Sequence, residues 1–140
     1  MSRFAFTRTM TTRFSDMDGM GHVNNAVFLT YFEEARMAYW MQVMGKPDLS
    51  GMNMILARAE VDFRSPLIAP ETIEVGVGCT KIGRTSFVLE EDMHEVKSGR
   101  LVAEARKVLV HYDYVALRAV PVTPEMRARM LADSPGAKQG

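Results

Sequence analysis

The sequence predicts an α+β fold in which a curved antiparallel sheet wraps around one long central helix. The first observation is a stretch without Gly or Pro, residues 26–44, with apolar side chains at three- and four-residue steps. The second is a series of four later runs that alternate apolar and polar side chains and are separated by turn residues. The third is size: 140 residues, 47% of them hydrophobic, suffice for one domain with its own core.

The chain before the helix divides into a strand and a loop. Residues 3–14 tolerate extended backbone and are poor in helix formers, which predicts a first strand. Residues 15–21 then hold two glycines, two aspartates and a serine, a composition typical of a loop with tight or positive-φ turns. We expect a helix to follow this loop directly.

The helix over residues 26–44 is the strongest element of the pattern. Asn24 or Asn25 can cap its start, because an Asn side chain accepts hydrogen bonds from the free amides of a first turn. Gly45, with Pro47 two residues later, ends it. The second half of the helix is apolar nearly all round, so we expect it to be buried from several sides.

The remaining chain supplies the strands that wrap the helix. Four runs succeed one another and are broken by Ser65-Pro66, Gly83-Arg84 and Ser98-Gly99, which predicts an antiparallel meander. Together with the central helix, this is the outline of a hotdog fold. The four runs cover residues 57–64, 73–79, 86–96 and 101–113.

A second, shorter helix is predicted after the last strand. Thr123 can cap it, Pro124 occupies its first helical position and Glu125 lies in its first turn. We expect this helix to run to about Leu131. Residues 1–131 would then form a single hotdog domain and residues 132–140 a flexible tail.

Charge and cysteine content exclude several classes of function. Lys plus Arg (17) equals Asp plus Glu (17), which argues against binding to nucleic acid. Cys79 is the single cysteine, so we expect neither an internal disulfide nor a Cys-rich zinc site, and a reducing cytoplasm fits best. The longest apolar stretch, residues 37–44, is far shorter than the roughly 20 residues of a membrane span. We expect a cytoplasmic protein with no membrane anchor.

Motifs of several common enzyme classes are absent. The sequence has no Gly-x-Ser-x-Gly elbow, no phosphate-binding loop ending in Gly-Lys-Ser/Thr, no His-Glu-x-x-His and no Gly-x-Gly-x-x-Gly. Its three histidines, His22, His94 and His111, are widely separated, and the last two lie in predicted strands. We therefore expect no metal site and no cofactor.

The one dense polar cluster is the segment 16–25, just before the central helix. A helix N-terminus presents unpaired amides and the positive end of the macrodipole, which stabilise a carbonyl oxygen as negative charge develops on it. Asp18, as an ionised carboxylate, can attack a carbonyl carbon or take a proton from water. A thioester is a suitable target, since its thiolate leaves with little need of protonation.

The same segment also fits a purely structural role. Asp and Asn before a helix are usually caps, glycine-rich turns are usually only turns, and a lone histidine such as His22 more often makes a structural hydrogen bond. The two aspartates do not define a carboxylate pair, because their relative direction at this spacing is not determined. We assign Asp16 to an Asx turn and Asp18, which is nearer to the helix, to the chemistry.

The sequence resembles the 4-hydroxybenzoyl-CoA thioesterase family of hotdog proteins. The signature lies in residues 13–25, Arg-Phe-Ser-Asp-Met-Asp-Gly-Met-Gly-His-Val-Asn-Asn, followed by residues 31–36, Tyr-Phe-Glu-Glu-Ala-Arg. The long first motif is specific, whereas the later pieces are weak by themselves. The similarity covers most of the chain up to about Leu131 and continues through residues 63–67, 82–87 and 121–124.

The resemblance implies hydrolysis of acyl-CoA or acyl carrier protein thioesters by a homodimer or homotetramer whose active sites lie at subunit interfaces. The nucleophile or general base of the family falls on Asp18, and the backbone amide that polarises the thioester carbonyl falls on Asn25. One bacterial branch has a histidine at the position of Asn25, so its use of that side chain does not carry over.

The run His-Val-Asn-Asn is closer to long-chain acyl-CoA thioesterases and to plant acyl carrier protein thioesterases. In the plant enzymes an asparagine follows the aspartate by two positions and a histidine by four. Here the histidine is present as His22, but the chain departs from the pattern with Met20 at the asparagine position. The resemblance thus implies an orienting role for His22 without that asparagine.

Four further residues are assigned to substrate binding. Asn24 adjoins the polarising amide, and Arg64 and Arg84, on loops between strands, can bind CoA phosphates through charge-assisted hydrogen bonds. Tyr31 can shape an acyl pocket, although core packing is the commoner role for such a side chain.

The alternative function is a hotdog protein that binds or senses an acyl thioester without hydrolysing it.

Overall fold

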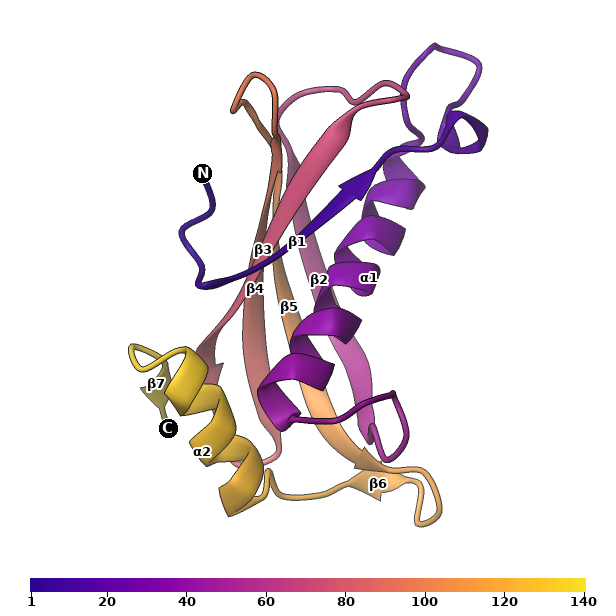
Figure 1. Ribbon diagram of the computed structural model, residues 1–140. Coiled ribbons are helices and arrows are strands. Elements are labelled where there is room, and N and C mark those ends of the chain that lie inside the picture. The colour runs from indigo at the N-terminus through magenta and orange to yellow at the C-terminus, as the bar shows by residue number, and fades with distance from the viewer.

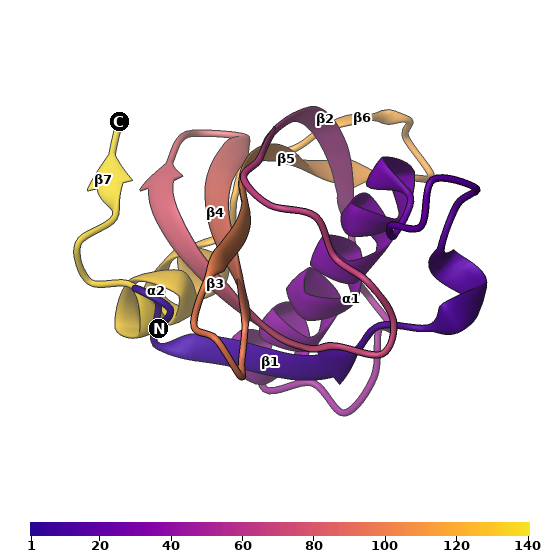
Figure 2. The ribbon, with the colours of Figure 1, turned by 90° about the horizontal axis from the view of Figure 1, so that it is seen from above.

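The computed structural model describes all 140 residues as one curved sheet around one long helix (Figure 1). Seen from above, the sheet arches over the helix, which confirms the predicted hotdog fold (Figure 2). In chain order the elements are β1 (Phe6–Thr11), the 3-10 turn η1 (Phe14–Asp16), α1 (Asn25–Met44), β2 (Met54–Phe63), β3 (Thr72–Ile82), β4 (Ser86–Glu95), β5 (Leu101–Asp113), β6 (Arg118–Ala119), α2 (Pro124–Asp133) and β7 (Lys138–Gln139).

The ends of α1 lie where the sequence predicts them. Asn24 is the N-cap, and its side-chain oxygen accepts a hydrogen bond from the N–H of Ala26 at 2.9 Å. At the other end Gly45 adopts a left-handed conformation with φ 64° and donates its N–H to the carbonyl of Gln42. Glycine takes this conformation without the strain that a Cβ would impose, so it ends the helix.

The strand order differs from the predicted meander. β3, β4 and β5 are antiparallel neighbours, but the full order is β1-β3-β4-β5-β2. β2 therefore pairs with β5 at one edge, and β1 takes the place beside β3 that a meander gives to β2. The prediction was wrong for β2 because alternation identifies a strand without identifying its neighbour. The segment 64–71 between β2 and β3 crosses the end of the sheet and is no tight hairpin (Figure 2).

The core lies between α1 and the concave face of the sheet. Buried side chains of β3 alternate along this face, as predicted, and the Trp40 ring of α1 stacks on Phe87 of β4 with centroids 5.6 Å apart. α2 covers the second half of α1 and buries Met126 and Met130. The second half of α1 is therefore enclosed by both the sheet and α2.

The core also contains an ion pair beneath α1. Lys107 Nζ on β5 lies 2.7 Å from Glu91 Oε2 on β4, and both side chains are buried. The same ammonium lies 4.8 Å from the centre of the Phe32 ring of α1. Burial disfavours both charged forms, so it raises the pKa of Glu91 and lowers the pKa of Lys107.

β2 is the least covered of the long strands. Of its side chains only Met54 is buried, and Phe63 at its end is 50% exposed. The predicted alternation over residues 57–64 therefore does not produce a buried face within one chain. The reason is that α1 approaches the sheet most closely at β3 and β1, so the edge strand β2 keeps an open side.

The last segment of the chain differs from the expected flexible tail. α2 continues to Asp133, beyond the predicted end at Leu131, and its cap Thr123 accepts a hydrogen bond from the N–H of Met126. β7 then pairs in parallel with the end of β3, and the N–H of Gly140 donates to the carbonyl of Ile82. β7 could not be predicted, because two polar residues are too few to show the alternation that identifies a strand.

Candidate active site

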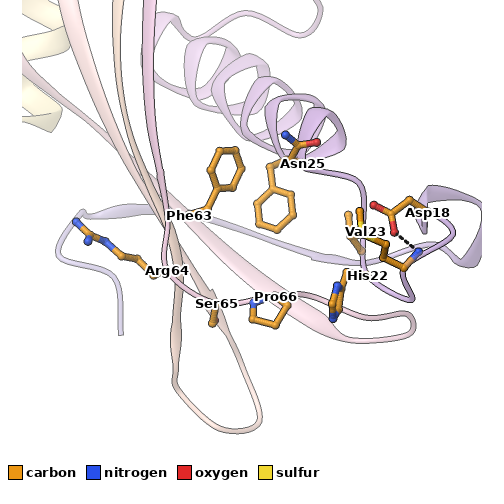
Figure 3. A pocket seen from close by; sticks show the side chains of 10 residues that line it. Asp18, His22, Val23, Asn25, Phe63, Arg64, Ser65 and Pro66 are labelled. Atoms are coloured by element: carbon orange, nitrogen blue, oxygen red, sulfur yellow. Dashed lines mark hydrogen bonds between the residues drawn. The ribbon is translucent and has the colours of Figure 1, made fainter.

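The loop between β1 and α1 is held by hydrogen bonds between its own two arms. The N–H of Asp18 donates to the carbonyl of His22 at 2.8 Å, and Met17 forms an isolated antiparallel bridge with Val23. Gly21 closes the turn between the arms with φ 83°, a conformation suited to glycine. The loop therefore folds back on itself and presents Asp18 beside the start of α1 (Figure 3).

The first turn of α1 leaves the amide of Asn25 open. The side chain of Asn24 accepts from the N–H of Ala26, and its carbonyl accepts from the N–H of Val27. The N–H of Asn25, the first helical residue, has no hydrogen-bond partner within the chain. This free N–H lies at the positive end of a 20-residue helix, where it can stabilise a negatively charged oxygen.

A pocket of ≈ 460 Å³ opens between the loop, the start of α1 and the end of β2 (Figure 3). This volume lies within the range typical of small-molecule sites, about 300 to 1,000 Å³. Asp18 and Arg64 lie on opposite sides of the pocket in this view, with Phe63 between them. The lining residues are Asp18, Met20, His22, Val23, Asn25, Phe28, Phe63, Arg64, Ser65 and Pro66.

Asp18 keeps one carboxylate oxygen free of hydrogen bonds within the chain. Its side chain is half-buried, and Oδ1 accepts a hydrogen bond from the N–H of Met20 at 2.9 Å (Figure 3). The second oxygen, Oδ2, has no hydrogen-bond partner within the chain. The structure thus brings a carboxylate with one free oxygen and a residue with a free N–H, Asn25, to the lining of the same pocket.

The structure places Tyr31 outside this pocket. Its hydroxyl donates to Oδ2 of Asp16 at 2.7 Å, and Nε of Arg13 donates to the same oxygen at 2.9 Å. The tyrosine hydrogen bond lowers the pKa of Asp16, while burial and this carboxylate raise the pKa of Tyr31 to about 12. Tyr31, predicted to shape an acyl pocket, instead holds Asp16. The Asx turn predicted for Asp16 does not form, because its side chain accepts from Tyr31 and Arg13, and it is Asp18 that accepts from the N–H two residues on.

The two predicted arginines lie at different ends of the molecule. Arg64 lines the pocket and also donates to Glu104 at 3.2 Å. Arg84 lines a separate cavity at the turn between β3 and β4, where the carbonyl of Gly83 accepts from Arg127 of α2. Of the two arginines predicted to bind CoA phosphates, only Arg64 therefore lines this pocket within one chain.

Of the two remaining predicted residues, His22 lines the pocket and Asn24 does not. His22 lines the pocket with an exposed ring, and its carbonyl holds the N–H of Asp18. Asn24 does not line the pocket, because its side chain is used as the N-cap of α1. The histidine therefore lines the same pocket as Asp18 without a side-chain hydrogen bond to it, and the asparagine lies outside the pocket.

The sequence did not single out the aromatic floor of the pocket. Phe28 of α1 meets Phe63 of β2 edge-to-face, with ring centroids 5.2 Å apart and an interplanar angle of 76°. Phe28 belongs to the apolar face of the predicted helix, and the break at Ser65-Pro66 marks the end of β2. Neither signal shows that the two rings meet, because the contact joins residues far apart in the sequence.

The wall formed by residues 65 and 66 is held by Arg100. Its guanidinium donates to the carbonyl of Pro66 at 3.0 Å, to the carboxylate of Glu71 at 2.8 Å and to Glu95 at 3.3 Å. Backbone hydrogen bonding joins this wall to the loop, since the N–H of Val23 donates to the carbonyl of Leu67. The pocket therefore has a braced wall that is hydrogen-bonded to the loop carrying Asp18.

Two further features of the chain bear on its chemistry. No three His, Cys, Asp or Glu side chains come together in a way that would hold a metal ion. None of the helices has the length and apolar character needed to cross a membrane.

Comparison with known proteins gives consistent matches over nearly the whole chain. A thioesterase from Thermus thermophilus, complexed with coenzyme A and Zn, is 34% identical, covers 96% of this chain and 98% of its own, and superposes with a TM-score of 0.86. A predicted thioesterase from Bacillus stearothermophilus is 29% identical with the same coverage and a TM-score of 0.84. The protein YsmA of Bacillus subtilis is 25% identical over 128 residues, which is 91% of this chain and 86% of YsmA.

The family model of the thioesterase-like superfamily matches residues 12–130, which include the loop, α1, the long strands and most of α2. This match covers far more than half of the chain, and the pocket described above lies entirely within it. The chain therefore belongs to the thioesterase-like superfamily.

Proposed function

We propose that this protein hydrolyses acyl-CoA thioesters to a free acid and coenzyme A, with Asp18 as the reacting carboxylate and the N–H of Asn25 as the group that polarises the carbonyl. One observation carries the proposal: both groups open onto one pocket at the amino end of α1. The coenzyme A complex of the Thermus relative supports CoA as the thiol part of the substrate.

The geometry suggests how the thioester reacts. When the carbonyl oxygen accepts from the N–H of Asn25, the positive end of α1 stabilises the charge that develops on that oxygen. In one route Asp18 bonds to the acyl carbon, the C–S bond breaks, the thiolate leaves with the electron pair, and water hydrolyses the resulting anhydride. In the other, Asp18 takes a proton from water, whose oxygen adds to the acyl carbon before the thiolate leaves.

The test of the function follows free thiol release from a panel of acyl-CoAs, from acetyl to palmitoyl and including benzoyl. We expect turnover by the wild type and a loss of about 100- to 10,000-fold in kcat for Asp18→Asn and Asp18→Ala. A quenched single turnover analysed by mass spectrometry distinguishes the routes, because only direct attack adds the mass of the acyl group to the protein.

A matched control is available for the Asp18 variants. Asp48 accepts a hydrogen bond from the N–H of Ser50 two residues on, as Asp18 does from Met20, but it lines none of the larger cavities. Asp48→Asn should therefore keep wild-type kcat. Unchanged turnover in both Asp18 variants would refute the assignment of Asp18. Tight binding of the panel without thiol release would instead favour a binding or sensing protein.

Arg64 is proposed to bind the phosphates of CoA at the mouth of the pocket. Its side chain is 51% exposed and already contacts Glu104 and Asp62, so it can supply charge without being buried. Arg64→Ala should raise KM for an acyl-CoA but not for the same acyl group on N-acetylcysteamine, which lacks phosphates. Arg84→Ala is the control, and a KM effect as large as that of Arg64→Ala would contradict the assignment.

We also expect a homodimer or homotetramer. β2 is an edge strand with exposed apolar residues on it, among them Ile55, Leu56 and Phe63, and an uncovered edge of this kind favours pairing with another chain. Light scattering should give a mass of at least twice 15.7 kDa.

The thiol carrier can be tested separately. The rates of hydrolysis of an acyl carrier protein thioester and of the matching acyl-CoA show which carrier is preferred.

A further inference from the structure

One buried hydroxyl ties the loop of the active site to the central helix. Tyr31 is 2% exposed, and its hydroxyl donates to Oδ2 of Asp16 at 2.7 Å, a contact between residues fifteen positions apart. Nε of Arg13 donates to the same oxygen at 2.9 Å. Hydrogen bonds to an ionised carboxylate are stronger than those between neutral groups, so this oxygen is held firmly from two sides.

Asp16 transmits this restraint to both reacting groups. Its carbonyl accepts the N–H of Asn24 at 2.9 Å, and Asn24 directly precedes the polarising amide of Asn25. Along the other arm of the loop Asp16 lies two residues before Asp18, whose N–H is bound to His22. Asp16 is thus bound to α1 through its side chain and to Asn24 through its carbonyl. Both contacts restrain the segments that carry the Asp18 carboxylate and the Asn25 amide.

We propose that Tyr31 and Asp16 are positioning residues that set the distance between the Asp18 carboxylate and the N–H of Asn25. Neither side chain lines the pocket, so neither touches the substrate. The kinetic part of the inference rests on the proposed function, because Asp18 and Asn25 are the reacting groups there. Reaction rates are sensitive to such distances, and a misplacement of 1 Å can cost about 100-fold.

The sharpest variant is Tyr31→Phe, which removes only the hydroxyl and keeps the ring in the core. We expect kcat for the best acyl-CoA to fall by about 10- to 100-fold with KM nearly unchanged, since the pocket wall is intact. Asp16→Asn keeps an oxygen that can accept from Tyr31 and should lose less. The double variant should lose less than the two single losses combined, because both act through one contact.

Tyr39→Phe is the matched control. Tyr39 lies on the same helix, is fully buried, and has a hydroxyl without a hydrogen-bond partner. Its removal should leave kcat unchanged. If Tyr31→Phe keeps full activity while Asp18→Asn is inactive, the positioning role is refuted and the proposed function stands.

Hydrogen exchange gives a readout that does not depend on catalysis. In Tyr31→Phe the amides of Asn24 and Asp18 should exchange faster than in the wild type, because the loop is released from the helix. In Tyr39→Phe they should exchange at the wild-type rate. Equal exchange of these amides in the two variants overturns the inference even if no thioester is hydrolysed.

Discussion

The two halves of α1 differ in the contacts that hold them in place. The first half begins at an open amide and a polar loop, and the contacts that hold it in place include the hydrogen bonds of Asp16 and Tyr31. The second half is enclosed by the sheet and α2, with Tyr39, Trp40 and Met44 all buried. Only the first turn of a helix has unpaired amides, so the proposed chemistry depends on that end, where closer packing would fill the pocket.

This difference separates activity from stability. Substitutions in the second half should lower the free energy of unfolding and leave the rate of the folded enzyme unchanged. Substitutions at the first turn should lower the rate with smaller losses of stability. Four predictions test this division, beginning with the largest expected effect.

The ion pair between Lys107 and Glu91, beneath Phe32, lies at the boundary between the halves. Lys107→Met should lower the free energy of unfolding by about 3–5 kcal/mol, because the buried Glu91 loses the ammonium that it is hydrogen-bonded to and keeps only the charge of Arg36, to which it makes no hydrogen bond. The double variant Lys107→Met/Glu91→Met should recover most of this loss. Urea denaturation measures both, and a single variant as stable as the wild type would contradict the prediction.

Met130 lies in α2, which covers the second half of α1, so a substitution of Met130 tests the role of this enclosed half. Its side chain is fully buried in the core cluster shared with Trp40. Met130→Ala should cost about 2–5 kcal/mol through lost contacts and a residual cavity. Below the melting transition, kcat of the folded variant should equal that of the wild type. A loss of kcat at temperatures where the variant is fully folded would show that the two halves are coupled.

Asn24 tests the open half. Asn24→Ala removes the side chain that caps Ala26 and should lower the free energy of unfolding by about 1 kcal/mol. It should also lower kcat, because fraying of the first turn moves the N–H of Asn25. Asn24→Ser, which can still cap, should restore most of both quantities in thermal melts and thiol-release assays. Failure of serine to restore kcat would point to a direct role for the Asn24 side chain.

Acid should weaken the link between the loop and the helix. The hydrogen bond from Tyr31 lowers the pKa of Asp16 in the folded protein, so its stabilising contribution is complete above the unfolded pKa, about 3.9. That contribution is lost as the pH falls through the lowered pKa. Unfolding measured between pH 6 and pH 3 should show a shallower loss of stability in Tyr31→Phe than in the wild type. Identical slopes would argue against this role of Asp16.

Much of the fold and part of the site can be predicted from the sequence. The predicted bounds of α1 and β5, the caps Asn24 and Thr123, and the placement of Asp18, His22 and Asn25 at one pocket all agree with the structure. These features depend on local propensity, capping and a specific motif, which are properties of neighbouring residues. The place of β2 beside β5 and the contact of Phe28 with Phe63 could not be predicted this way.

The sequence by itself determined the helix, the strands and the loop that carries Asp18, because periodicity and turn chemistry act within a few residues. Only the tertiary structure decided that Tyr31 meets Asp16 rather than substrate, and that Arg64 but not Arg84 reaches the pocket of its own chain. Each of these outcomes depends on which distant elements pack together. Which elements pack together is decided by burial and strand pairing over the whole domain, and a local sequence pattern does not contain that information.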